Sequence, residues 1–146
     1  MNYWPHLVAM LVGAGLTVQV GMNSTVRLAL GSPVVAAVVN FGVGLAALVV
    51  VAVVGGARVA PGGAGTVPAW AWLGGLLGAA YVASTTVLGP RLGATALLAL
   101  VLAGQMLAAL AVDQFGVLGF PQNVVTPGRL VGAALVIVGA VLIVRR

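Results

Sequence analysis

Long apolar runs cover almost the whole chain, and this feature constrains the fold more than any other. Runs of roughly 18 or more residues recur with almost no charge, and each is long enough to cross a membrane core about 30 Å thick as a helix. Hydrophobic residues make up 62% of the 146 positions and charged residues 5%. Soluble domains carry charge at about a quarter of their positions. The chain is therefore predicted to be an all-α integral membrane protein.

Clusters of glycine, proline and polar residues divide the apolar sequence into five predicted spans, which we expect to form one domain over residues 1–146. Ser32 is suited to cap a helix and Pro33 to take its first position. Residues 58–68 are rich in glycine and proline and predict a flexible aqueous loop, whereas residues 89–93 predict a very short turn. The predicted helices cover residues 6–30, 34–57, 69–88, 94–112 and 128–144.

Hydrogen-bonding side chains are rare inside these spans, so they identify the candidate site. Gln19, Asn23 and Arg27 are spaced four apart, which places them on one face of the first helix. A polar group inside a membrane needs a partner. Asn40 on the second helix therefore either holds two helices together or contacts substrate. Tyr81, near the middle of the third span, either bonds a neighbouring helix or lines a cavity.

The later spans add fewer polar groups. Ser84 and Thr85 follow Tyr81 on the third helix, and Gln105 lies inside the fourth. Either glutamine, Gln19 or Gln105, could instead serve helix packing. The fifth helix has no polar side chain after its first turn, which suits a peripheral packing position or a lipid-facing one.

The charged residues are six arginines and a single acid, Asp113, which give a net charge of +5. The arginines lie at the ends of apolar runs, so we interpret them as determinants of topology and lipid-headgroup contact, not as a nucleic-acid site. Asp113 is expected to pair with Arg129 or Arg58, or to be solvated. With one acid, one histidine, no lysine and no cysteine, neither a catalytic triad nor a metal site can be assembled, so we expect no enzyme activity and no cofactor.

Five spans distribute the arginines unevenly over the two sides of the membrane. Two fall on the side of the N-terminus and four on the side of the C-terminus, which favours a cytoplasmic C-terminus. The bias is weak, as it would be in a chain that inserts in both orientations. The arginines on the first side are Arg58 and Arg129, and those on the second are Arg27, Arg91, Arg145 and Arg146.

Several short motifs together resemble the small five-helix branch of the drug/metabolite transporter superfamily, the YdcZ-like group. The resemblance extends over essentially the whole chain. The motifs are Gln19 and Asn23 with the GSP turn at 31–33, then Asn40, Phe41 and Gly44, WxWLGGLLGAAYV at 70–82, GPRLGA at 89–94 and AGQ at 103–105.

The resemblance implies a half-transporter, because larger members of the superfamily contain two inverted five-helix repeats. Such repeats place substrate at the membrane midplane, between the halves. It also implies that the first, third and fourth helices line the cavity. In the small multidrug-resistance branch, which the resemblance also brings in, the first helix carries a glutamate that binds protons and cationic drugs in competition. The first helix of this chain has no acid, so proton-coupled export of cations by that route is not expected. Implied cavity residues are Gln19, Asn23, Tyr81, Ser84, Thr85 and Gln105, with Asn40 added from the second helix.

The expected function is therefore a secondary transporter, either an exchanger or a facilitator, in the bacterial inner membrane. It would move a small neutral, zwitterionic or anionic metabolite as an antiparallel, dual-topology homodimer. Arg27 and Arg91 are expected to act as a gate or as membrane anchors. Its partners would be membrane lipid, a small-molecule substrate and a second copy of the chain or a homologous chain. The alternative is a non-transporting membrane scaffold, or one half of an obligate heterodimer.

Overall fold

The computed structural model describes residues 3–58 and 60–145, and within them it is helical with no β-strand. The helices are α1 (Trp4–Leu30), α2 (Pro33–Val54), the short α3 (Gly63–Thr66), a 3₁₀ helix η1 (Ala69–Leu73), α4 (Gly74–Leu92), α5 (Ala94–Phe115) and α6 (Pro127–Val144). Five helical segments of the described chain are long and apolar enough to span a membrane, because η1 and α4 together form the third. This confirms the predicted all-helical, five-span protein.

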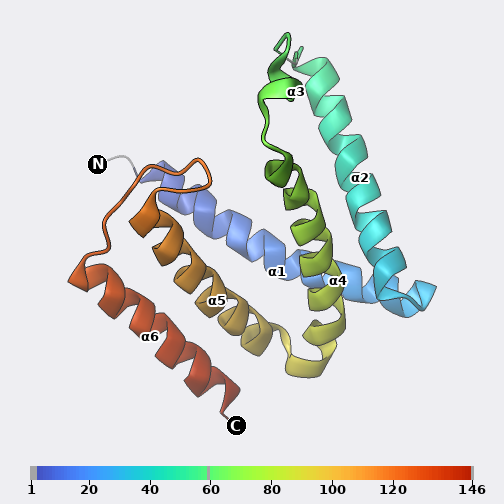
Figure 1. The fold of residues 1–146 in the computed structure, drawn as a ribbon. Coiled ribbons are helices and arrows are strands. Elements are labelled where there is room, and N and C mark those ends of the chain that lie inside the picture. Colours follow the sequence, from blue (N-terminus) through green and yellow to red (C-terminus); the bar gives the residue numbers. More distant parts are fainter. Residues whose placement is uncertain (1–2, 59, 146) are drawn as a thin grey trace. The chain divides into compact units, whose positions relative to one another are not determined.

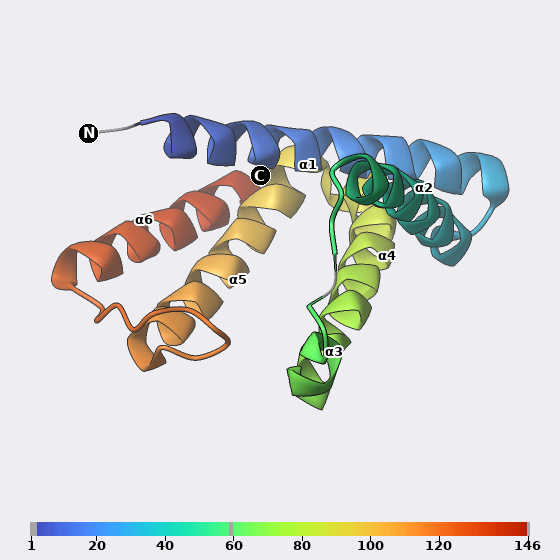
Figure 2. The same ribbon diagram turned by 90° about the horizontal axis from the view of Figure 1, so that it is seen from above.

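The chain divides into two compact units, Met1–Arg91 and Leu92–Arg146, which are described separately. In the first unit, α1 packs against α2, and α4 lies next to α2 (Figure 1). A Cβ built on Gly78 of α4 would lie 3.5 Å from the ring of Phe41 on α2, an ordinary van der Waals distance, so Phe41 packs next to α4 at this position. In the second unit α5 and α6 run antiparallel, side by side in both views (Figures 1 and 2). That the chain forms a single domain stays a prediction.

The turn between α1 and α2 follows its sequence signals closely. Gly31 adopts a left-handed φ of 72°, and its N–H donates to the carbonyl of Arg27, which ends α1. The Ser32 hydroxyl accepts a hydrogen bond from the Val35 N–H at 3.3 Å, and Pro33 opens α2. The predicted cap is therefore confirmed.

Helix α1 begins at Trp4, two residues before its predicted start, and the predicted third helix begins as the 3₁₀ helix η1. Three helices also end at other residues than predicted. Helix α2 ends at Val54, and α5 continues to Phe115, so Asp113 lies in its last turn. Helix α4 continues through Pro90 to Leu92, and the turn before α5 is reduced to Gly93, with a φ of 80°. Proline normally clashes with the Cβ of the residue before it; here that residue is Gly89, which has none, and only one hydrogen bond of the last turn is lost.

The loop between α5 and α6 is tied down by hydrogen bonds. Val125 N–H donates to Gln114 Oε1 at 2.9 Å, Gln122 Nε2 donates to the Gln114 carbonyl at 3.0 Å, and Asn123 N–H donates to the Asp113 carbonyl at 2.8 Å. The Thr126 hydroxyl caps α6 by accepting the Arg129 N–H. The loop therefore fixes the end of α5 relative to the start of α6.

Candidate substrate site

A pair of amide side chains joins α1 to α2 inside the spanning region. Gln19 Nε2 donates to Asn40 Oδ1 at 3.3 Å, and both residues are half-buried. The bond connects positions 21 residues apart, so no local pattern could have specified it. Of the two roles considered for Asn40, the helix-to-helix hydrogen bond is present; contact with substrate stays a prediction.

The amide pair lines a groove of about 480 Å³ in the first unit. The rest of its surface is apolar and belongs to α2. The bond uses one Gln19 N–H and one lone pair of Asn40. It therefore leaves the Gln19 carbonyl oxygen and the Asn40 amide N–H groups available to a bound molecule. The lining residues are Gln19, Asn40, Phe41, Val43, Gly44, Leu45 and Leu48.

Phe41 is shared between this groove and a second one between α2 and α4. The second groove has a volume of about 440 Å³ and an almost wholly apolar lining, to which α4 contributes Ala79, Ala80 and Ala83. The ring of Phe41 thus borders both spaces, and its size affects the width of each.

Asn23 lies one turn beyond Gln19 and is more deeply buried, with 5% of its surface exposed. Its side chain makes no hydrogen bond with any residue that the structure describes. Its amide atoms are not fully enclosed, because no enclosed side-chain N or O atom of the described residues lacks a partner. Asn23 therefore has hydrogen-bonding capacity that the described fold does not use.

Two threonines on α4 complete the buried polar residues of the described chain. Thr85 donates to the carbonyls of Tyr81 and Val82 at 2.9 and 3.2 Å, and Thr86 donates to the Val82 carbonyl at 2.7 Å. Because their hydroxyl hydrogens stay within the helix, they can offer only lone pairs to a ligand. Thr86 is fully buried and was not among the predicted residues. Its position four residues after Val82, on an apolar face of α4, could have indicated its burial.

The other predicted cavity residues are more open. Tyr81 is half-buried and Ser84 is exposed, while Gln105 is exposed on α5 in the second unit. Six of the seven predicted residues thus belong to the first unit, and the structure joins two of them, Gln19 and Asn40, directly. The roles of all seven toward a substrate stay predictions.

Arg27 and Arg91 occupy the last turns of α1 and α4. A cation there interacts favourably with the negative end of the helix dipole. Neither makes an ion pair with a described residue. This placement accounts for both arginines in terms of helix stability, and a gating or anchoring role remains a prediction.

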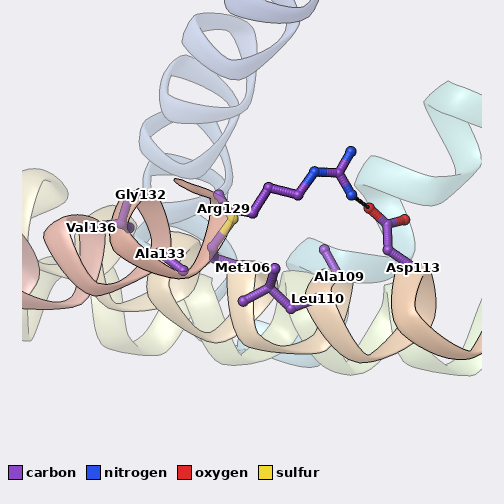
Figure 3. A pocket seen from close by; sticks show the side chains of 8 residues that line it. All are labelled: Met106, Ala109, Leu110, Asp113, Arg129, Gly132, Ala133 and Val136. Carbon is purple, nitrogen blue, oxygen red and sulfur yellow. Dashed lines mark hydrogen bonds and ion pairs between the residues drawn. The ribbon is translucent and has the colours of Figure 1, made fainter. Parts of the chain in front are cut away.

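Asp113 pairs with Arg129, which settles one choice that the sequence left open. Arg129 Nη1 lies 3.2 Å from Asp113 Oδ2, across the rim of a groove between α5 and α6 (Figure 3). The described residues contain no group of three or more His, Cys, Asp or Glu side chains that could hold a metal ion.

Five apolar spans with few polar side chains define a multi-pass α-helical membrane protein. A family model matches residues 4–142, and its description is "Putative inner membrane exporter, YdcZ". The chain therefore belongs to this family, a group related to the drug/metabolite transporters, as the resemblance predicted. No curated protein and no solved structure matches the chain significantly. The family and the five spans locate the chain in the inner membrane and support a transporter role, not an enzymatic one.

Proposed function

We propose that the chain is a secondary transporter, working as an exchanger or facilitator, for a small neutral, zwitterionic or anionic metabolite. The observation that carries this proposal is the Gln19–Asn40 pair at the groove between α1 and α2. The Gln19 carbonyl and the Asn40 amide provide an acceptor and donors without net charge. Such a set suits hydroxyl, amide or zwitterionic groups better than an isolated cation.

The groove also suits transport because it offers a bound molecule two polar side chains within an otherwise apolar lining. Two amides among Val, Leu, Gly and Phe side chains orient a small molecule but bind it weakly enough for release. Anionic substrates remain within the proposal because Arg27 and Arg91 lie at helix ends of the same unit. No acid lies in this unit among the described residues, so its chemistry does not favour cations.

The working form that we propose is an antiparallel homodimer. A two-fold axis in the membrane plane brings the same residues in from both copies, as inverted repeats do in larger transporters. The bias of only two arginines between the two sides of the membrane is weak, which is compatible with insertion in both orientations.

The proposal is tested by flux into proteoliposomes over a panel of neutral, zwitterionic and anionic metabolites. The decisive variant is the double substitution Gln19→Leu with Asn40→Leu, which removes both partners and leaves no unpaired amide. Thr17→Val is the matched control, since Thr17 is half-buried on α1, like Gln19, and its hydroxyl bonds only to the Gly13 carbonyl. We expect flux of at least one metabolite in the wild type and the control, and none in the folded double variant.

Equal flux in the double variant would remove the basis of the proposed site. The dimer is tested separately with topology reporters fused to the C-terminus. Signal from both sides of the membrane supports dual topology. A single orientation would overturn the antiparallel homodimer, and together with absent flux it would favour the alternative, a scaffold or one half of a heterodimer.

A further inference from the structure

The groove between α5 and α6 in the second unit has no place in the proposed transport site. Its volume is about 450 Å³. Each helix lines it with four residues spaced i, i+3, i+4 and i+7, so it follows the line where the two helices face each other. These residues are Met106, Ala109, Leu110 and Asp113 from α5, and Arg129, Gly132, Ala133 and Val136 from α6.

Apart from one ion pair at its rim, the groove is apolar (Figure 3). Small side chains at Ala109, Gly132 and Ala133 keep the two helices from filling it. From the pair, each helix continues the lining for seven residues, which corresponds to about 10 Å at 1.5 Å per residue. The groove is thus a narrow apolar slot with two opposite charges at one end.

Asp113 and Arg129 are each placed unfavourably with respect to the dipole of their own helix. Asp113 lies in the last turn of α5, near the negative end of that helix dipole. Arg129 lies in the first turn of α6, near the positive end. Each placement is unfavourable by a few tenths of a kcal/mol to about 1 kcal/mol. The opposite assignment would have suited both helices, so helix stability does not explain this pair.

The pair also keeps most of its hydrogen-bonding capacity. Arg129 uses only Nη1, toward Asp113 at 3.2 Å and the Asn123 carbonyl at 3.3 Å. Its Nε and Nη2 groups, and Oδ1 of Asp113, have no partner among the described residues. The side chains remain 40% and 33% exposed, while the tied loop holds the backbone of both in place. A ligand can therefore reach three guanidinium N–H groups and one carboxylate oxygen.

We propose that this groove binds one phospholipid with a zwitterionic phosphoethanolamine headgroup. Arg129 takes the phosphate, Asp113 takes the primary ammonium, and one acyl chain lies in the slot between α5 and α6. The position of the pair in the spans also supports a bound lipid, because Asp113 and Arg129 lie at the ends of two membrane spans, at the level of lipid headgroups.

Charge complementarity selects this headgroup over others. The Asp–Arg pair is neutral as a whole and matches a headgroup with one negative and one positive group. An anionic phosphoglycerol headgroup would leave Asp113 facing no cation. A phosphocholine headgroup has no N–H to donate to the carboxylate. The single acid of a second copy, its Asp113, is already paired with the Arg129 of that copy, so a second copy offers no unpaired carboxylate to this pair.

The test is native mass spectrometry of the full chain released from nanodiscs that contain equal amounts of phosphoethanolamine, phosphocholine and phosphoglycerol lipids with identical acyl chains. We expect the wild type to retain the phosphoethanolamine lipid about fivefold over each of the others, which corresponds to about 1 kcal/mol. Asp113→Asn should lower its preference over phosphocholine to about one. Arg129→Gln should lower retention of all three.

A groove-filling variant separates lipid binding from folding. A Cβ at Gly132 or at Gly139 of α6 would meet no atom within 4 Å, and only Gly132 lines the groove. Gly132→Leu should abolish retention of every lipid, whereas Gly139→Leu should retain the phosphoethanolamine lipid like the wild type. Equal retention of the three lipids by the wild type, or a preference unchanged in Asp113→Asn, would overturn the proposal. Loss of a dimer instead of a lipid in Gly132→Leu would assign the groove to a second copy and overturn it as well.

Discussion

The hydrogen bond between Gln19 and Asn40 makes a quantitative prediction about stability. At 3.3 Å between half-buried amides, this hydrogen bond is slightly longer than usual. Interhelical bonds of this kind inside membrane proteins contribute about 0.6 kcal/mol on average and at most about 1.7 kcal/mol. Replacing one partner by leucine also leaves the other amide unpaired in an apolar groove, which costs about 1 kcal/mol or more.

We therefore expect Gln19→Leu and Asn40→Leu each to lower the free energy of unfolding by about 1 to 2 kcal/mol. The double variant should cost less than the sum, because it leaves no amide unpaired. The coupling energy obtained from the cycle should be about 0.6 to 1.5 kcal/mol. Reversible unfolding in mixed micelles, with increasing fractions of denaturing detergent, measures all four proteins.

Strict additivity, within about 0.3 kcal/mol, would refute the reasoning, because it would mean that the two amides do not interact in the membrane. Gln19→Leu combined with Thr17→Val provides the control cycle. Thr17 bonds to a carbonyl of its own helix, so its coupling to Gln19 should be close to zero. If the Gln19→Leu/Asn40→Leu variant stays folded and no longer transports, the pair is needed for transport as well as for helix packing.

Three further predictions concern single positions. Gly116→Ala should lower the free energy of unfolding by about 1 to 3 kcal/mol, because φ is 59° there and a Cβ would lie 2.8 Å from that of Gln122; Gly139→Ala should not, and equal thermal melting of the two would contradict this. Ser32→Ala should cost about 1 kcal/mol through loss of the α2 cap, whereas Ser32→Thr should keep most of it; no melting difference between them would count against the cap. Phe41→Ala should admit larger substrates in the flux assay than Phe41→Leu, since the ring borders both grooves, and an unchanged size limit would exclude it from the pathway.

The family assignment and the geometry support different parts of the functional conclusion. The match over residues 4–142 supports the inner-membrane location and the transporter role. The groove supports a proposed substrate chemistry, because its polar groups are uncharged amides. The lipid site is independent of both, since its residues all lie in the second unit. Loss of lipid binding and loss of transport can thus be observed separately.

The sequence alone predicted the five spans and the cap at Ser32. Both depend on local properties: the length of an apolar run that can cross a bilayer, and a hydroxyl within reach of the N–H three residues later. It also limited the ion-pair partners expected for Asp113 to Arg58 and Arg129, the arginines on its side of the membrane, and left a solvated Asp113 as the alternative.

Only the tertiary structure decided which side chains meet. Asn40 could have bonded any neighbouring helix, and the packing of α1 on α2 selects Gln19. Asp113 pairs with Arg129 because the tied loop returns the chain to the end of α5. Thr86 is buried because of the face that α4 turns inward. Local patterns fix where a helix lies in the chain and which residues share its face, but the partner of a polar group depends on contacts between segments far apart in sequence.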